Sequence, residues 1–214
     1  MADLRFECID VQPERYAAVP TLQFRLRLSE ATGVAVHAVA LRCQIRIEPQ
    51  RRRYSEAEAD RLLDLFGELA RWGETLKPLQ FASVSVMVPS FQGECDVALG
   101  VACTYDFEVA AAKYFHSLEE GEIPLLLLFS GTVFVHGETG FSVEQVPWHK
   151  ESQYRLPVSV WHEMMDLYFP NTAWVRVRRE TLDALQAFKS RAALPTWDDA
   201  FETLLRQGGR GVAR

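Results

Sequence analysis

The residues best placed to do chemistry lie in the segment WHEMMD, at positions 161–166. A histidine followed by a glutamate begins the pattern of the helical zinc proteases, which need a second histidine four residues after the first. Side chains four residues apart share one face of a helix, so they can hold one metal ion together. Here Asp166 stands where the second histidine belongs, and the sequence identifies no third ligand. We therefore interpret His162 and Asp166 as part of a polar helix face.

The four cysteines are Cys8, Cys43, Cys95 and Cys103, and each falls on the apolar side of an alternating stretch. No C-x-x-C spacing occurs, so the zinc and redox signatures are absent. Cys95 and Cys103 lie on one expected strand, about 26 Å apart, too far for a disulfide. We expect four buried, reduced and inert thiols.

Motifs that bind phosphates or carry a nucleophile are missing from the sequence. There is no G-x-x-x-x-G-K-[ST], no G-x-G-x-x-G after a strand and no G-x-S-x-G. The sequence therefore indicates no catalytic residue, no cofactor and no metal site, and we expect no enzymatic activity. A catalytic site assembled from distant residues stays open.

Two short charged segments are candidates for binding. QRRRYS, at 50–55, places Arg51, Arg52 and Arg53 just before an expected helix, where they could dock an acidic partner. The alternative is a solvated loop. EEGE, at 119–122, is an acidic turn, which we interpret as solvated rather than as a cation site.

The segment WVRVRRETLDALQAFK, at 174–189, runs from a short alternating strand into an amphipathic helix, and a second helix follows LPTWD. Strand, helix, turn and helix at these lengths are similar to the ribbon–helix–helix repressors, whose paired strands read the major groove. That similarity would assign DNA contacts to Trp174, Arg176 and Arg178. Tryptophan reads bases poorly, however. Residues 1–170 also carry 15 Lys and Arg against 24 Asp and Glu, a charge of −9 that repels phosphates.

Both helices of this tail carry an apolar stripe, which so small a unit cannot bury alone. The stripes are Leu182, Leu185, Phe188 and Ala192, then Trp197, Phe201, Leu204 and Leu205. We predict that the unit packs on the rest of the chain. Docking on a second copy, which would make a homodimer, or on another protein is the alternative, and DNA binding is a further one.

Most of the chain alternates between apolar and polar residues with period two, which is typical of strands buried on one side. The stretches are LRFEC (4–8), LQFRLRL (22–28), VALRCQIRI (39–47), ASVSVMV (82–88) and CDVALGVACTYDF (95–107). LLLLFSGTVFV (125–135) is apolar on both faces and is expected to be central. Short glycine-containing turns join these runs, which favours antiparallel pairing. The predicted fold is mostly β with α additions: an antiparallel two-layer β-sandwich with an inserted helix and a C-terminal helical unit.

Helical periodicity interrupts the strands. Residues 55–73 are expected to form one helix, which begins with a capping box of Ser55 and Glu58. The next helix, before Pro170, carries the apolar stripe Trp161, Met164, Met165 and Tyr168. We therefore predict a sandwich over residues 1–158 with the helical insertion 55–73. A C-terminal unit of a helix, a short strand and two helices over 159–207 packs on it, and 208–214 form a flexible tail.

Nothing in the sequence predicts a membrane protein. A spanning helix needs about 20 apolar residues, and the longest apolar run, at 123–135, is shorter and contains proline and glycine. The first ten residues carry charges where a signal peptide needs an apolar core. We expect a cytoplasmic protein without a membrane partner.

The C-terminal third resembles a bacterial family known only as a domain of unknown function. The motifs that carry the resemblance are YFPN followed by AW, then RETLD and LPTWD; the opening LRFECIDV and the region RRRYSEAE are similar too. Genes of this family often stand beside those of nickel–iron hydrogenases and their maturation factors. The resemblance thus implies an accessory or assembly role with a protein partner, and it assigns no catalytic residue. A DNA-binding regulator that works through the tail is the alternative function.

Overall fold

The computed structural model describes residues 2–104, 109–137, 140–172 and 177–209. The chain divides into two compact units, residues 1–172 and 173–214. The first unit contains all the strands that the structure describes. They are β1 (Leu4–Pro13), β2 (Thr21–Glu30), β3 (Val36–Ile47), β4 (Leu79–Val88), β5 (Glu94–Ala102), β6 (Glu122–Gly137), β7 (Gly140–Gln145) and β8 (Glu151–Pro157).

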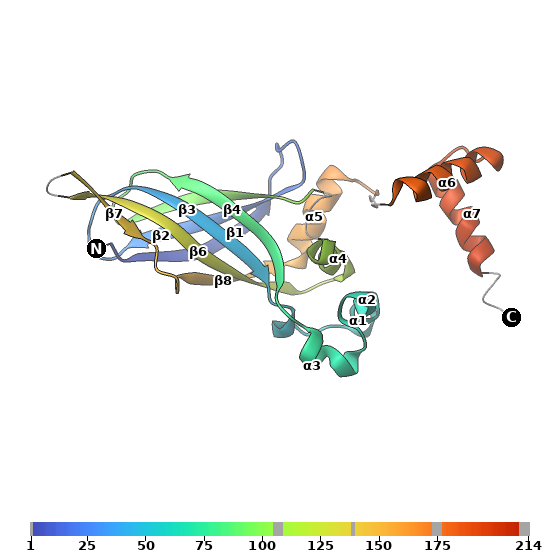
Figure 1. Ribbon diagram of the computed structural model, residues 1–214, viewed down its shortest axis with the longest axis horizontal. Coiled ribbons are helices and arrows are strands. Elements are labelled where there is room, and N and C mark those ends of the chain that lie inside the picture. The colour runs from blue at the N-terminus through green and yellow to red at the C-terminus, as the bar shows by residue number, and fades with distance from the viewer. Residues whose placement is uncertain (1, 105–108, 138–139, 173–176, 210–214) are drawn as a thin grey trace. The chain divides into compact units, whose positions relative to one another are not determined.

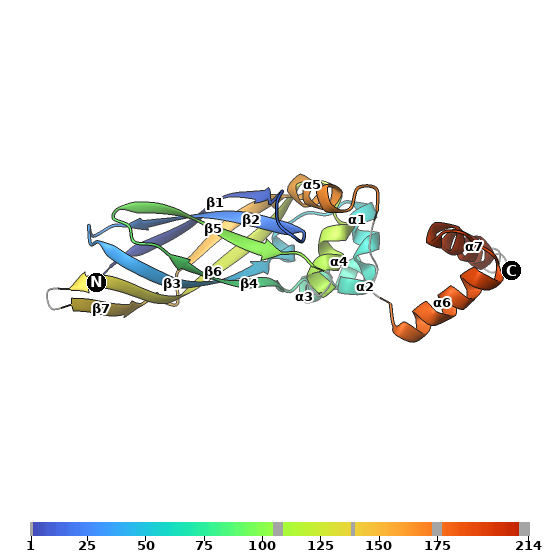
Figure 2. The ribbon, with the colours of Figure 1, turned by 90° about the horizontal axis from the view of Figure 1, so that it is seen from above.

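The strands form two antiparallel sheets that face each other, and this confirms the predicted sandwich (Figures 1 and 2). One sheet has the order β1-β2-β5; in the other the order is β4-β3-β6-β7, and β8 also pairs with β6. Alternation fixes which face is buried: Leu22, Phe24 and Leu26 are fully buried while Arg25 is exposed. Across the core, Phe6 of β1 stacks on Phe129 of β6, with ring centroids 4.6 Å apart.

Strand β6 is central, as its two apolar faces predicted. One edge pairs with β3, and the other edge is shared by two strands in succession, β8 along residues 122–128 and β7 along residues 132–137. Gly131 lies between these two stretches and has a φ of +142°, which side chains rarely adopt. A Cβ atom there would lie 2.1 Å from the carbonyl oxygen of Ala40, so only glycine fits.

The helical insertion is broken, and the prediction of one continuous helix over 55–73 was wrong. The structure has α1 (Glu56–Arg61), α2 (Leu63–Phe66), a 3-10 turn η2 (Leu69–Arg71) and α3 (Trp72–Thr75). The break after Phe66 has a physical cause at Gly67, whose φ of +74° leaves the helical region. Trp72 then folds back, and its indole N–H donates to the carbonyl oxygen of Gly67 at 2.9 Å.

Two further helices, α4 (Val109–Ser117) and α5 (Val158–Tyr168), lie beside the helices of the insertion. The α-helices that the structure describes in the first unit, α1 to α5, thus form a helical layer at one end of the sandwich (Figures 1 and 2). Helix α5 was predicted, and its Trp161 and Met164 are buried as expected. Helix α4 was not predicted. Phe115 of α4 stacks on Trp161 of α5 at 4.5 Å, which joins the two helices.

The boundary between the units lies further along the chain than 158/159. Helix α5 belongs to the first unit and contacts β1, β2 and β8. The hydroxyl of Tyr168, near its end, donates to the carbonyl oxygens of Glu14 and Ala17, at 2.6 and 3.0 Å. These contacts place α5 with the sandwich rather than with the C-terminal helices.

The second unit is a helical hairpin of α6 (Arg179–Arg191) and α7 (Trp197–Gly209). Thr196 caps the start of α7, since its hydroxyl accepts from the N–H of Asp199 at 3.1 Å. Helix α7 extends into the segment 208–214 that we expected to be flexible, and 210–214 lie outside the described residues. The predicted strand at 174–178 falls largely on residues 173–176, which also lie outside them. The packing of this unit on the sandwich stays a prediction.

Across the part of the chain that the structure describes, no helix combines the length and the apolar character that crossing a membrane requires.

Candidate functional site

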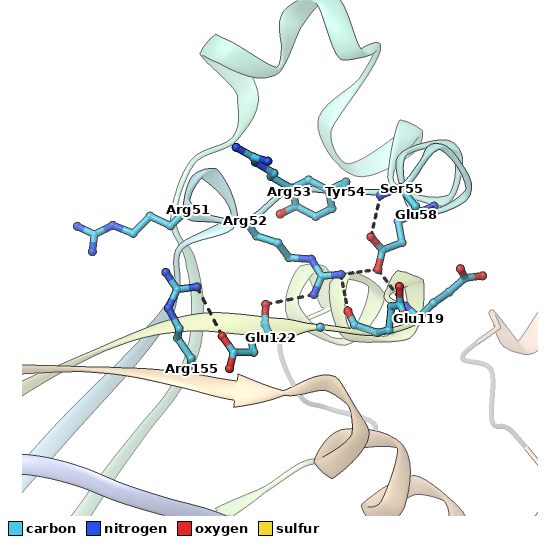
Figure 3. Close-up of a pocket in the computed structure, with 11 residues that line it drawn as sticks. Arg51, Arg52, Arg53, Tyr54, Ser55, Glu58, Glu119, Glu122 and Arg155 are labelled. Carbon is cyan, nitrogen blue, oxygen red and sulfur yellow. Dashed lines mark hydrogen bonds and ion pairs between the residues drawn. The ribbon is translucent and has the colours of Figure 1, made fainter.

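The arginine triplet 51–53 and the acidic turn 119–122 line one pocket of about 640 Å³ (Figure 3). The triplet follows β3 through the 3-10 turn η1 (Pro49–Arg51), and the acidic turn leads into β6. Because β3 and β6 are paired neighbours, with Ile47 opposite Leu125, the sheet brings the two segments together. The pattern of residues along the chain did not indicate that the arginine triplet and the acidic turn lie side by side.

Arg52 joins the two sides of the pocket (Figure 3). Its guanidinium forms an ion pair with Glu58 of α1, and the two side chains are only 7% and 4% exposed. The guanidinium also donates to the carbonyl oxygens of Glu120, at 2.7 Å, and Glu122, at 3.2 Å. Arg52 therefore fixes the acidic turn to the start of α1, and it does not extend towards a partner.

Three donors converge on the carboxylate of Glu58. Besides Arg52, the backbone N–H groups of Ser55 and Glu119 donate to it, at 3.1 and 3.0 Å. Burial raises the pKa of Glu58, but these hydrogen bonds and the charge of Arg52 outweigh burial and hold the pKa below its usual value. The predicted capping box of Ser55 and Glu58 is confirmed, and its glutamate also holds the buried arginine.

The other two arginines of the triplet are exposed, and Figure 3 shows them pointing away from the pair of Arg52 and Glu58. Arg51 pairs with Glu48 at 3.1 Å. Of the residues that the structure describes, four arginines and four glutamates line the pocket, so their formal charges cancel. The pocket therefore lacks the positive field that attracts an anion. Docking of an acidic partner on the triplet would depend on Arg51 and Arg53, and it stays a prediction.

The tail residues that we associated with binding are only partly described. Trp174 and Arg176 lie outside the described residues. Arg178 is exposed and occupies the N-cap position of α6, where its backbone is extended. Its side chain makes no cap hydrogen bond. The strand that the ribbon–helix–helix similarity requires therefore falls largely outside the described residues, and it stays a prediction.

Helix α7 presents a row of large apolar side chains, Trp197, Phe201 and Leu205, which we call the apolar row. They are spaced four residues apart and are 38%, 46% and 74% exposed. The rings of Trp197 and Phe201 stack with centroids 6.0 Å apart. Ala200 is fully buried, so a different face of the helix is covered. The row contains three of the four residues of the stripe expected from the sequence, and the hairpin leaves these three exposed; Leu204 is half-buried.

A second pocket lies on the outer face of the five-stranded sheet and has a volume of about 440 Å³. Arg42, Ser130 and Trp148 are among its lining residues. We expected no functional role for these residues from the sequence. A tryptophan in a polar turn is the sequence feature that could have indicated the pocket, because so large an apolar side chain is normally buried for the most part.

The HExxD segment lies on α5 (Val158–Tyr168). His162 is half-buried and Asp166 is exposed on α5. Within the described ranges, no three His, Cys, Asp or Glu side chains are grouped to hold a metal ion. Burial, together with the nearby His162, lowers the pKa of His116 on α4.

Three of the four cysteines are buried as predicted, and Cys95 is only half-buried. Burial raises the pKa of Cys8, Cys43 and Cys103 to about 12 and also raises the pKa of Cys95. The thiolate is the reactive form. At pH 8 we therefore expect slow alkylation of the native protein, with Cys95 first, and rapid labelling of all four after denaturation. Mass spectrometry of a time course with iodoacetamide measures this. Fast labelling of Cys43 in the folded protein would contradict the assignment.

The fold and these sites define a β-sandwich protein with a helical layer at one end and a separate helical hairpin. The chain belongs to the family described as "Family of unknown function (DUF6084)", whose model matches residues 1–212. This confirms the resemblance to a family of unknown function and extends it over nearly the whole chain. No curated protein matches the sequence.

Two β-glucosidases are among the solved structures that the chain resembles weakly. The selenomethionine-labelled enzyme from Kluyveromyces marxianus has 8% identity and a TM-score of 0.24, over 72% of this chain and 15% of that chain. Beta-glucosidase 3B from Thermotoga neapolitana, in complex with α-D-glucose, has 11% identity and a TM-score of 0.26, over 72% and 17%. The chain thus spans less than a fifth of either enzyme, and likenesses of this size carry no argument about function.

Proposed function

We propose that this protein is a non-catalytic binding protein that docks on a protein partner through the apolar row of α7. The single observation that supports the proposal is the exposure of Trp197, Phe201 and Leu205 on one helix face. An amphipathic helix that lays such a face into a groove is a common mode of protein recognition.

The energetics favour an occupant for this face. Burying a large apolar side chain stabilises a complex by about 1.5–3 kcal/mol, so three of them can anchor an interface. The stack of Trp197 on Phe201 holds two of the anchors in place before binding, which lowers the entropy lost on association. Lys189 of α6 lies over the ring of Trp197, 5.8 Å from its centroid, and further restrains it.

The first unit supports the same assignment because it has a core of its own. Its buried apolar residues extend from Leu4 to Met164 and cover the inner faces of both sheets. From the sequence we expected the row to pack on the sandwich. A docking role instead leaves the row free for a partner, and the variant Phe201→Glu distinguishes these two arrangements.

The resemblance of the sequence to its family supplies the partner to test first. It implies a nickel–iron hydrogenase subunit or a hydrogenase maturation factor. An accessory role of this kind requires a docking surface and no catalytic residue.

The change Phe201→Glu tests the row. We expect it to weaken binding to a purified hydrogenase subunit or maturation factor at least tenfold, because a charge cannot enter an apolar groove without a partner. Gln207→Glu is the matched control: it adds the same charge to α7 outside the row and should leave the affinity unchanged. Calorimetry with the full chain measures both affinities, and light scattering reports the mass of each variant.

Several outcomes would contradict the proposal. Equal affinities of the two variants, or no binding by the unchanged protein, would remove the row as the docking surface. A lower melting temperature of Phe201→Glu without any partner would mean that the row packs within the chain. A dimer that Phe201→Glu converts to a monomer would assign the row to a second copy. Salt-sensitive binding of duplex DNA that is lost in Arg176→Ala with Arg178→Ala would favour the regulator.

A further inference from the structure

The pocket on the outer face of the five-stranded sheet is built around Arg42. On this face Arg42 of β3 lies between Ser85 of β4 and Ser130 of β6, its paired neighbours in the sheet. The serine side chains are short, so they leave room beside the long arginine. The pocket of about 440 Å³ lies here and also includes Trp148. Its volume is within the range of pockets for small molecules.

Trp148 is held at the edge of this pocket by an anchored loop. The loop joins β7 to β8 and passes the part of β6 that pairs with neither strand. Two backbone hydrogen bonds fix its ends: Val146 donates to Gly131 at 2.9 Å, and Phe129 donates to the carbonyl oxygen of Lys150 at 3.0 Å. The indole is nevertheless 91% exposed. A large aromatic surface is thus presented to solvent by a well-anchored segment.

The polar side chains of the pocket are ordered by contacts with one another. The Nε of Arg42 donates to the hydroxyl of Ser83 at 3.1 Å, and the amide of Gln44 donates to Gln80 at 2.6 Å. Among the residues that the structure describes, no acceptor is bound to the two terminal nitrogens of Arg42. Its guanidinium is therefore oriented by one hydrogen bond and keeps its outer donors for a ligand.

Charge favours an acidic ligand at this pocket. Among the described residues that line it, Arg42 alone is charged. In the register of the sheet, Glu151 of β8 lies opposite Leu128, which lies opposite Gln44. Glu151 and Gln44 are thus separated by two strand spacings, about 10 Å, and Arg42 lies two residues further along β3. A distance of about 10 Å is already the screening length at 0.1 M salt. Glu151 therefore opposes an anion at Arg42 only weakly.

We propose that this pocket binds a small organic carboxylate with a ring-shaped body. The carboxylate accepts two parallel hydrogen bonds from the terminal nitrogens of Arg42, a geometry that a guanidinium provides and an ammonium does not. The ring packs on the indole of Trp148, and the amides of Gln44 and Gln80, which line the same pocket, bond to its polar substituents. A sugar acid and an aromatic acid share this chemistry.

Titrations followed by NMR test the proposal on the full chain. The probes are glucuronate and 4-hydroxybenzoate, and each has a neutral counterpart, glucose and 4-hydroxybenzyl alcohol. The indole N–H signal of Trp148, assigned through Trp148→Phe, should shift with at least one acid. The neutral counterpart should bind at least tenfold more weakly. Which acid shifts the signal distinguishes a sugar acid from an aromatic acid.

Variants locate the binding. Arg42→Gln should weaken the acid at least tenfold, and Arg42→Lys should restore only part of the affinity because it lacks the fork of donors. Arg25→Gln removes an exposed arginine from the other sheet and should leave the affinity unchanged. The proposal is overturned if neither acid shifts the Trp148 signal, if the neutral molecules bind equally well, or if Arg42→Gln binds like the unchanged protein.

Discussion

Replacing Arg52 by alanine should lower the free energy of unfolding by about 3–5 kcal/mol, the usual cost of breaking a buried ion pair. The change leaves the carboxylate of Glu58 buried without its cation, and the carbonyl oxygens of Glu120 and Glu122 lose their donors. The acidic turn is then released from the start of α1. Urea denaturation of the variant, followed by circular dichroism, measures the loss.

Arg53→Ala is the matched control, since it removes an exposed arginine next in the chain. We expect it to change the free energy of unfolding by less than about 0.5 kcal/mol. Arg52→Lys keeps the charge without the fork of donors, so it should lie between the two alanine variants. A loss below about 1 kcal/mol for Arg52→Ala would show that water replaces the guanidinium at no great cost.

The same pair makes stability depend on pH in a defined direction. The pKa of Glu58 is lowered in the folded protein, so its carboxylate stabilises the fold fully above the ordinary pKa of 4.5. That contribution is lost as the pH falls through the folded-state pKa. The stability gap between the unchanged protein and Glu58→Gln should therefore shrink in acid.

Replacing Gly131 by alanine should cost about 3 kcal/mol or more, and it is the second large effect that we expect. A side chain is strained at a φ of +142°, and the new Cβ would meet the carbonyl oxygen of Ala40 at 2.1 Å. That oxygen belongs to the neighbouring strand β3, so β3 and β6 must separate locally. The melting temperature of the purified variant measures the effect.

Gly100→Ala is the control for this change. Gly100 also lies in a strand, but a Cβ there would meet only a side-chain methyl group of Thr21, at an ordinary 3.7 Å. We expect its stability to change by less than about 1 kcal/mol. Similar melting temperatures for the two variants would mean that the β3–β6 pair adjusts to a Cβ at 131.

Local pattern in the sequence was sufficient for six of the eight strands that the structure describes and for two helix starts, although the stretch expected at 95–107 ends as β5 at Ala102. The alternation of Phe24 and Arg25 predicts which side of β2 is buried, because successive side chains of a strand point to opposite faces. The capping boxes at Ser55 and Thr196 were predictable for a similar reason. Both depend on contacts between residues three apart.

Other elements were decided by contacts between distant parts of the chain. The break after Phe66 depends on the return of Trp72 to Gly67, and α4 depends on apolar contacts such as that between Phe115 and Trp161. Neither contact follows from helical periodicity. One continuous helix was therefore predicted over 55–73, and the helix at 109–117 was missed.

The candidate sites show most clearly the difference between what local sequence pattern determines and what contacts between distant segments decide. The sequence identified Arg52 as one of three equivalent arginines, and only the pairing of β3 with β6 separates it from its neighbours by burying it against Glu58. Arg42 and Trp148 are more than one hundred positions apart, and they line one pocket because β6 pairs with β3 on one edge and with β7 and β8 on the other. Residue types and spacing determine what a segment can form by itself. Which segments become neighbours is decided by burial of the sheet faces, since that free energy is gained only when the whole sandwich closes.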